Sequence, residues 1–358
     1  MGLRRCVKLQ SRSPTSFMSR APSPLDWRCH NEKPFNRVGA AIMPSDLILF
    51  VGEALAKYGF PAGHPLGVDR QAAFWQAAQQ QNLHRKVVVC EPTVATRAEL
   101  ARFHTPEHVA WVEARSRDGE GYLDYGDTPA FPGVFEAGAA VAGTALDGLE
   151  QIMTGKAAKS FQAIGGLHHA RRGNAAGFCV FNDLGVLIDT LRSRFRLERI
   201  AYVDIDVHHG DGIYYCYETD PHLIVVDIHE SGHFLYPGTG HAEETGRGAA
   251  KGTKLNLPLD PGAGDHDFFA AWERGLAHLR AYAPQFVILQ CGADSLLGDP
   301  LADLRLTPEA HGRVARDLAC LANETANGRM MVFGGGGYDL GNLAAAWTRV
   351  LAELLNAE

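Results

Sequence analysis

Residues that could bind a metal ion follow an apolar run near the middle of the chain. Residues 202–212 read YVDIDVHHGDG, a strand-like run that leads into three carboxylates and two adjacent imidazoles. Unpaired charges at a buried strand end are costly, and a metal ion is the most economical partner for them. Asp206 and His208 are two residues apart, so in an extended chain they point to one side. There an oxygen and a nitrogen ligand can meet on one divalent cation.

Three other apolar runs also end in polar residues. They read AIGGLHHA (163–170), FVILQCGAD (286–294) and MMVFGGGGY (330–338). The glycines before Tyr338 are not followed by a P-loop lysine or by Rossmann spacing, which disfavours a phosphate cradle. In an open α/β sheet the ligand lies at the carboxyl ends of the strands. The four run ends therefore predict one active site that includes His168, His169, Asp294 and Tyr338.

The rest of the chain alternates strand-like and helix-like segments. Short apolar runs predict strands at 46–51, 87–90 and 223–226. Apolar residues at helical spacing predict helices at 133–155, 265–282 and 308–327. This alternation predicts an α/β fold, a parallel sheet with helices on both faces. A chain of 358 residues, 46% of them hydrophobic, can bury one large core, so we expect a single catalytic domain.

Composition and charge exclude several classes of function. The formal net charge of −7 offers no electrostatic footprint for nucleic acid. No apolar run approaches the ~20 residues that a membrane-spanning helix needs. The seven cysteines are odd in number, scattered and without a C-x-x-C pair, which is typical of a reducing compartment. We expect a cytoplasmic protein, with homo-oligomerisation left open.

Residues 1–43 differ from the rest of the chain. They hold eight Lys or Arg against only Asp26 and Glu32, with many Ser and Pro, and they lack the apolar core of a secretory signal. We interpret them as a non-catalytic extension, either disordered or an arm at a subunit contact. An organellar transit peptide, an upstream start codon and an expression remnant are alternatives. The catalytic domain is then expected at 44–358.

Six segments together resemble the zinc-dependent histone deacetylase superfamily, in that family's order. They are GGLHHA (165–170), GFCVFND (177–183), DIDVHHGDG (204–212), YPGTG (236–240), GADSLLGDPL (292–301) and GGGGY (334–338). The stretch IHESGHFLYP (228–237) is most similar to the bacterial acetoin-utilisation branch, whose members are taken to be protein lysine deacetylases. The resemblance implies the arginase-deacetylase fold, with an eight-stranded, mainly parallel sheet. It also implies a hydrolase that removes acetyl groups from lysine side chains and releases acetate.

The resemblance implies that Asp206, His208 and Asp294 hold one metal ion. Arginase-like ureohydrolases share the fold but hold two manganese ions, through D-x-H-x-D and a later D-x-D. Here Gly210 and Leu296 stand where those motifs end in an acid, so the second metal site is absent. Two carboxylates and one imidazole with an open position suit a Lewis acid. Zinc is the family's metal, and ferrous iron or cobalt would also fit these ligands.

The resemblance also implies the catalytic roles. His169 is the base that takes a proton from water, with Asp211 as its carboxylate partner. His168 is the neighbour that supports it, with Asp204 as partner. Unequal carboxylate partners can separate the proton affinities of two histidines in one site. Tyr338 would donate its phenol hydrogen to the developing oxyanion.

The substrate positions follow from the same resemblance. Phe178 and Tyr236 occupy the positions that sandwich the lysine methylenes, and Gly177 suits close approach of the backbone to a ligand. Asp127 stands where the family has a rim carboxylate that holds substrate backbone amides, with a turn-forming role as the alternative. Acetylpolyamines and other small acylated amines are the alternative substrates. An acid at the slot mouth would favour them, and Leu301 stands there instead.

Two positions suggest further sites. A structural potassium ion behind the zinc would use Asp204, and Asp227 stands where the family usually has a serine. The extra negative charge of Asp227 should hold a cation at least as well as the serine does. Arg70 matches a family arginine near the acetate exit channel, with a surface arginine as the alternative.

Overall fold

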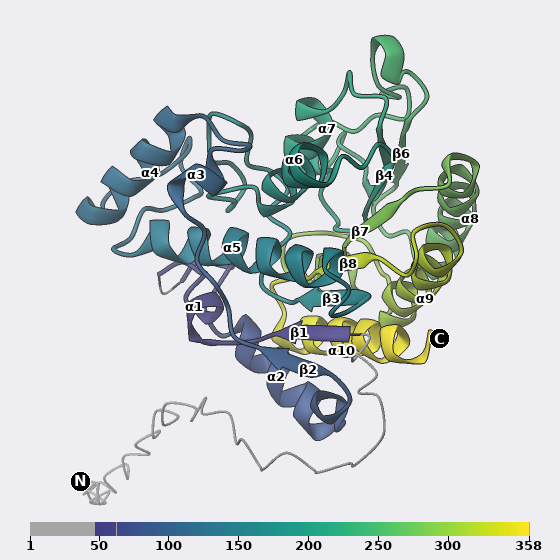
Figure 1. Ribbon diagram of the computed structural model, residues 1–358, viewed down its shortest axis with the longest axis horizontal. Helices are drawn as coiled ribbons and strands as arrows, with labels where there is room; N and C mark the ends of the chain where they lie inside the picture. The colour runs from purple at the N-terminus through teal and green to yellow at the C-terminus, as the bar shows by residue number, and fades with distance from the viewer. Residues whose placement is uncertain (1–46, 62, 358) are drawn as a thin grey trace, which may run out of the picture. The chain divides into compact units, whose positions relative to one another are not determined.

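An eight-stranded sheet forms the centre of the chain (Figure 1). The computed structural model describes residues 47–61 and 63–357, and the predicted extension at 1–43 lies outside them. The strand order is β2-β1-β3-β8-β7-β4-β5-β6, and every pairing is parallel. The strands are β1 (Leu47–Phe50), β2 (Val88–Cys90), β3 (Lys159–Gln162), β4 (Ile200–Asp204), β5 (Leu223–Glu230), β6 (Lys254–Leu259), β7 (Phe286–Gln290) and β8 (Met330–Phe333). The predicted α/β fold is confirmed, and the sheet is parallel throughout.

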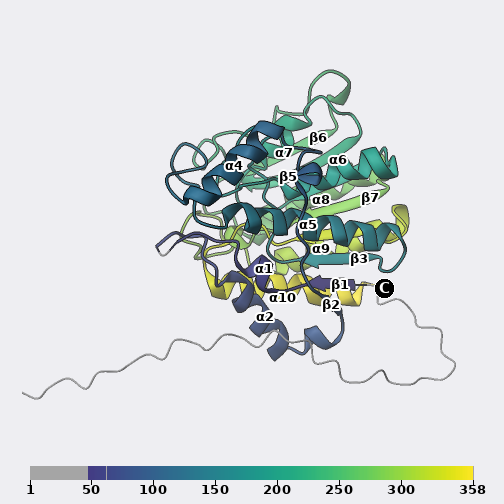
Figure 2. The same ribbon diagram turned by 60° about the vertical axis from the view of Figure 1, so that its left-hand side comes forward.

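Helices cover both faces of this sheet (Figures 1 and 2). The α-helices are α1 (Glu53–Ala56), α2 (Arg70–Gln80), α3 (Arg97–Leu100), α4 (Pro106–Asp118), α5 (Val134–Met153), α6 (Asp183–Phe195), α7 (Asp211–Cys216), α8 (Asp265–Tyr282), α9 (Pro308–Thr325) and α10 (Leu340–Asn356). Short 3-10 turns lie at Leu83–Arg85, Gly248–Ala250 and Ala293–Ser295. Among the residues that the structure describes, no helix is both long and apolar enough to cross a membrane.

Each face of the sheet has its own apolar core. On one face, Leu149 of α5 and Leu187 of α6 join Tyr202 of β4 in one buried cluster. On the other face, the ring of Phe74 in α2 lies 5.5 Å from that of Phe161 in β3. Burial of aromatic and branched side chains on both faces is the main force that holds such a sheet between helices.

The predicted elements agree with the structure except at β5. Helices α5, α8 and α9 and strands β1 and β2 occur where periodicity predicts them. Strand β5 was predicted only to Val226, but it continues to Glu230 and is buried throughout. Its polar half is tolerated because each group finds a partner. Asp227 bonds His229 at 2.6 Å, and Glu230 Oε2 accepts the Asp303 N–H at 2.8 Å.

Candidate active site

The four run ends singled out in the sequence belong to consecutive strands. In the sheet, β3, β8, β7 and β4 are neighbours in that order, and all run parallel. Their carboxyl ends therefore meet at one edge. A narrow cavity at this edge is lined by residues from three of the four ends, among them His168, His169, Asp206, His208 and Tyr338.

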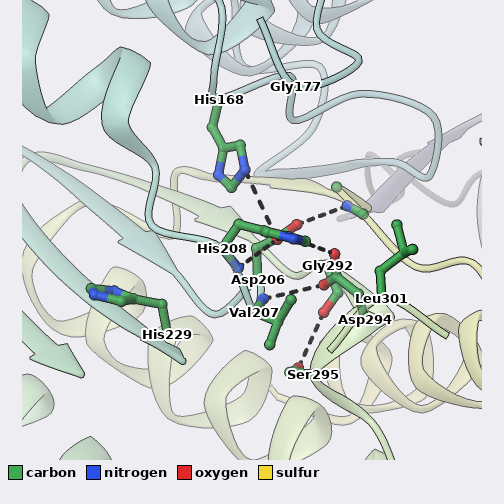
Figure 3. A network of polar contacts seen from close by, with 12 residues as sticks. His168, Gly177, Asp206, Val207, His208, His229, Gly292, Asp294, Ser295 and Leu301 are labelled. Carbon is green, nitrogen blue, oxygen red and sulfur yellow. Dashed lines mark hydrogen bonds and ion pairs between the residues drawn. The ribbon is translucent and has the colours of Figure 1, made fainter. Parts of the chain in front are cut away.

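Asp206, His208 and Asp294 converge at this edge (Figure 3). All three are buried, and one ligand atom from each lies within 4.8 Å of the others. Nδ1 of His208 is 3.1 Å from Oδ1 of Asp206 and 3.2 Å from Oδ2 of Asp294. Oδ2 of Asp294 is buried, and its contact with Nδ1 of His208 lacks the geometry of a hydrogen bond, so the described residues give this oxygen no hydrogen-bond donor. A buried carboxylate oxygen without a donor, beside an oxygen and a nitrogen ligand, fits a divalent cation.

The electrostatics of this cluster also favour a bound divalent cation. Burial disfavours a charged His208, but the carboxylates of Asp206 and Asp294 overcome it and raise the pKa of His208 to about 10. Burial and the charge of Asp206 raise the pKa of Asp294 to about 7. The carboxylates of Asp206 and Asp294 thus repel each other when both are charged, and a bound cation would relieve this repulsion.

The two neighbouring histidines have separate carboxylate partners. Nδ1 of His168 lies 2.7 Å from Oδ2 of Asp204, and Nδ1 of His169 lies 2.8 Å from Oδ1 of Asp211. Their Nε2 atoms face each other at 3.1 Å. Burial and the charge of His168 lower the pKa of His169 to about 4. Burial opposes a charged His168, but Asp204 and the other nearby carboxylates raise its pKa to about 10. His169 is therefore the neutral member of the pair.

Gly177 brings the backbone against the catalytic edge. Its φ is +52°, and a Cβ at this position would lie 2.6 Å from Cδ2 of His169 and 3.0 Å from Cε1 of Tyr236. The ring of Tyr236 lies 5.1 Å from that of His169, and the ring of Phe178 lies 5.9 Å from that of Tyr338. The two predicted slot residues therefore each contact one predicted catalytic side chain.

Phe178 adopts a backbone conformation that favours glycine, with φ of +67°. Its N–H donates to Oγ1 of Thr128 at 3.0 Å, and its carbonyl accepts the Tyr58 hydroxyl at 2.7 Å. A non-glycine residue at positive φ persists when the surroundings hold it there, and such positions cluster at ligand sites.

Asp124, rather than Asp127, forms the turn at the rim. Its Oδ1 accepts the N–H groups of Gly126, Asp127 and Thr128 at 3.0, 3.1 and 2.9 Å. Three backbone donors on one carboxylate oxygen fix the loop. The side chain of Asp127 is left exposed, as a rim carboxylate must be.

Asp299 links the mouth to Tyr338. Its Oδ1 accepts the N–H of Leu301 at 3.0 Å, and its Oδ2 accepts the N–H of Tyr338 at 2.9 Å. Leu301 itself is 36% exposed. One buried acid thus sets the position of the oxyanion candidate and of a mouth residue.

Asp204 and Asp227 are paired in register on β4 and β5. Asp227 bonds His229 with Oδ1 at 2.6 Å and Gly210 N–H with Oδ2 at 2.9 Å. Oδ1 of Asp204 accepts the Asp206 N–H at 3.1 Å, and Oδ2 bonds His168. Each carboxylate oxygen thus already has a protein partner, so no orphaned oxygen here marks a cation site.

Sequence comparison assigns the chain to a known family. A model of the histone deacetylase domain matches residues 64–354. The chain belongs to the histone deacetylase family. It is 32% identical over 318 residues to the acetoin utilization protein AcuC of Bacillus subtilis, covering 86% of this chain and 82% of that protein. It is 32% identical over 327 residues to histone deacetylase RPD3 of Saccharomyces cerevisiae, covering 88% and 73%.

A solved structure of the HDA15 HD domain has the same fold. The TM-score is 0.80 at 29% identity, over 87% of this chain and 89% of that chain. Both the predicted family and the predicted fold are confirmed. As a histone deacetylase family member, the chain is a deacetylase hydrolase.

Gln290 was not predicted as a residue of this deacetylase site, and the alternative prediction of a surface position for Arg70 was wrong. Arg70 is buried and donates from Nη2 to the Gly335 carbonyl at 2.6 Å and from Nε to the Gly337 carbonyl at 3.0 Å, so it is not a surface arginine. Nε2 of Gln290 donates to Oδ2 of Asp206 at 2.8 Å. The sequence could have predicted a role for Gln290, because it is the one polar residue in the apolar run 286–290.

Proposed function

We propose that this deacetylase is metal-dependent and removes acetyl groups from lysine side chains. One observation carries the proposal: the buried cluster of Asp206, His208 and Asp294 lies beside the His169–Asp211 pair. These ligands would hold one ion per chain. Zinc is the family expectation, and ferrous iron or cobalt suits the same donor set.

A divalent ion held there would polarise the acyl oxygen and lower the pKa of a bound water. His169, held at Nδ1 by Asp211, takes the proton of the attacking water at Nε2. The water oxygen joins the acyl carbon, and the hydroxyl of Tyr338 donates a hydrogen bond to the developing oxyanion. The carbon–nitrogen bond then breaks, and the proton held on His169 passes to the lysine amine as it departs. The products are the free lysine amine and acetate.

Phe178 and Tyr236 are proposed to flank the lysine methylenes, with Asp127 holding substrate backbone amides at the rim. A potassium ion near Asp204 and Asp227 is a separate proposal that rests on the resemblance and on their adjacent register. A cytoplasmic location is proposed from cysteine usage, since the seven cysteines are scattered along the sequence and include no C-x-x-C pair.

One observation favours a second candidate function, the deacetylation of acetylpolyamines. Asp124 and Asp127 place two carboxylates on the loop beside the slot, and a distal ammonium could meet them. Leu301, which is uncharged and partly exposed on the loop before α9, favours lysine side chains instead. The two substrates therefore have to be separated by assay.

The test compares the zinc-loaded enzyme on acetyl-lysine peptides with N-acetylputrescine and acetylspermidine. We expect higher kcat/KM on the peptides. Leu301→Glu should shift kcat/KM towards the polyamines by about tenfold to a hundredfold, the value of one partly desolvated charge pair. Leu297→Glu is the matched control, because Leu297 is an exposed leucine of the same loop. If the unmodified enzyme prefers acetylpolyamines over every peptide, the lysine proposal is wrong.

A further inference from the structure

A cavity of about 620 Å³ adjoins the proposed lysine slot. Three loops and the start of α7 line it: the loop before α5 with Asp124 and Asp127, the loop before α6 with Arg171, the loop after β5 with Tyr236, and Asp211 at the first position of α7. Tyr236 and Asp127 are also the proposed slot wall and rim. The α-carbon end of a lysine that enters the slot would therefore lie in this cavity.

Arg171 presents a fixed guanidinium to the cavity. Its Nη2 lies 2.8 Å from Oδ2 of Asp211, its guanidinium carbon lies 5.0 Å from the ring centroid of Tyr215, and its backbone N–H bonds the Asn174 carbonyl at 3.0 Å. The side chain is nevertheless 44% exposed. A guanidinium has five N–H donors in a fork that matches a carboxylate. The edge that does not bond Asp211 can therefore take a second carboxylate without reorganisation.

The loop before α5 presents the opposite charge to the same cavity. Oδ1 of Asp124 is committed to three backbone N–H groups, whereas Asp127 is exposed and its Oδ1 has one long contact, 3.3 Å from the Thr128 hydroxyl, so Asp127 is the carboxylate that can meet a ligand. Burial and the neighbouring Asp124 raise the pKa of Asp127 to about 6. At neutral pH two carboxylates thus lie close together, and a cation beside them would relieve their repulsion.

We propose that this cavity binds the charged end of a free Nε-acyl-lysine, with Arg171 on its α-carboxylate and Asp127 on its α-ammonium. The inference rests on the proposed acyl-lysine activity and names its substrate class as the amino acid. A lysine inside a peptide chain carries neither charge. A cavity with a guanidinium on one loop and an exposed carboxylate on another therefore matches the amino acid better than the peptide.

Three substrates of similar size test this on the zinc-loaded full chain. They are Nε-acetyl-lysine, its α-amide, which lacks the carboxylate, and 6-acetamidohexanoate, which lacks the ammonium. We expect kcat/KM to fall by about tenfold for each analogue, mostly through KM, as for one lost charge-assisted hydrogen bond. Equal kcat/KM for the acid and the amide would overturn the inference.

Variants assign the effect to its residue. Arg171→Gln removes a contact to Asp211 and should lower kcat on every substrate, but the acid-to-amide ratio within that variant should fall to about one. Arg172→Gln is the matched control, because that guanidinium bonds Asp189 at 2.8 Å, is 41% exposed and does not line the cavity. It should keep the full ratio. Asp127→Asn should instead remove the preference for the ammonium.

The outcomes separate this inference from the proposed function. Hydrolysis of acetyl-lysine peptides together with an acid-to-amide ratio near one would overturn the inference alone. A full ratio that persists in Arg171→Gln would do the same. Failure to hydrolyse any acyl-lysine compound, with acetylpolyamines turned over, would overturn both.

Discussion

Oδ1 of Asp211 lies 2.8 Å from Nδ1 of His169, at the bottom of a site where both side chains are nearly fully buried. This contact keeps a hydrogen on Nδ1 and leaves the lone pair of His169 on Nε2, the atom that lies 3.1 Å from Nε2 of His168. Burial opposes a charged Asp211, but the hydrogen bonds and charges of His169 and Arg171 overcome it, and the pKa of Asp211 falls to about 2. His169 can therefore act as a base whose orientation is fixed.

Asp211→Asn should lower kcat by roughly 100-fold or more, the scale of a general base that has lost its orientation. An amide can bond Nδ1 as a donor, which would favour the wrong tautomer. Asp189→Asn is the control, since Asp189 is also paired with an arginine but lies outside the site. Steady-state kinetics on an acetyl-lysine substrate measure the effect, and an unchanged kcat would remove Asp211 from the mechanism.

Tyr338→Phe should lower kcat by roughly two to three orders of magnitude with little change in KM. The ring keeps its packing against Phe178, and only the hydroxyl that we propose as the oxyanion donor is lost. Tyr125→Phe, which removes a hydroxyl from a fully exposed ring, should be neutral. A nearly normal kcat in Tyr338→Phe would show that another group stabilises the oxyanion.

Gly177→Ala should lower kcat/KM by about 100-fold, because the added Cβ would meet His169 at 2.6 Å and push the base out of position. The positive φ of +52° adds strain at the same residue. Gly173→Ala lies in the same loop, where a Cβ would meet nothing within 4 Å, and should be nearly silent. Equal activity of the two variants would mean that the loop adjusts freely.

Acid should destabilise the fold through His104. This side chain is buried and accepts the Asn182 N–H at 2.9 Å, and burial together with His108 lowers its pKa to about 3. An unfolded histidine has a pKa of ~6.5, so between these values the unfolded chain binds a proton that the folded chain does not. The stabilisation is complete above pH ~6.5 and is lost as pH falls, by about 1.4 kcal/mol per pH unit.

Urea unfolding at pH 7, 6 and 5 measures this slope. His104→Gln keeps an acceptor for Asn182 but cannot take up the proton, so its stability should vary less with pH. Parallel slopes in the two proteins would show that His104 does not carry the effect.

The sequence could predict the parts of the site that lie directly after apolar strands. Asp206, His208 and Asp294 were visible because each follows a strand, and parallel strands bring such ends together. Asp124 and Arg171 were not predicted, since a turn acid and a basic loop residue look like ordinary surface residues. Asp299 was missed because its partner, Tyr338, lies 39 residues away in the chain.

The potassium site stays a prediction, and the partners of Asp227 show what the sequence resemblance leaves out. The substitution of serine by Asp227 reads as an extra ligand in the sequence. In the structure, the imidazole of His229, two residues further along the same strand, bonds one oxygen of Asp227. The Gly210 N–H, which only the folded chain brings into contact, bonds the other.

We propose that deacetylation requires a single metal ion, held by Asp206, His208 and Asp294. The most direct measurement is acetate release from an acetyl-lysine substrate by chelator-stripped protein, titrated with zinc while bound metal is counted. We predict that activity is absent in the stripped protein and rises linearly to a plateau at one ion per chain. Full activity without metal, or a plateau that needs two tightly bound ions, would contradict the account.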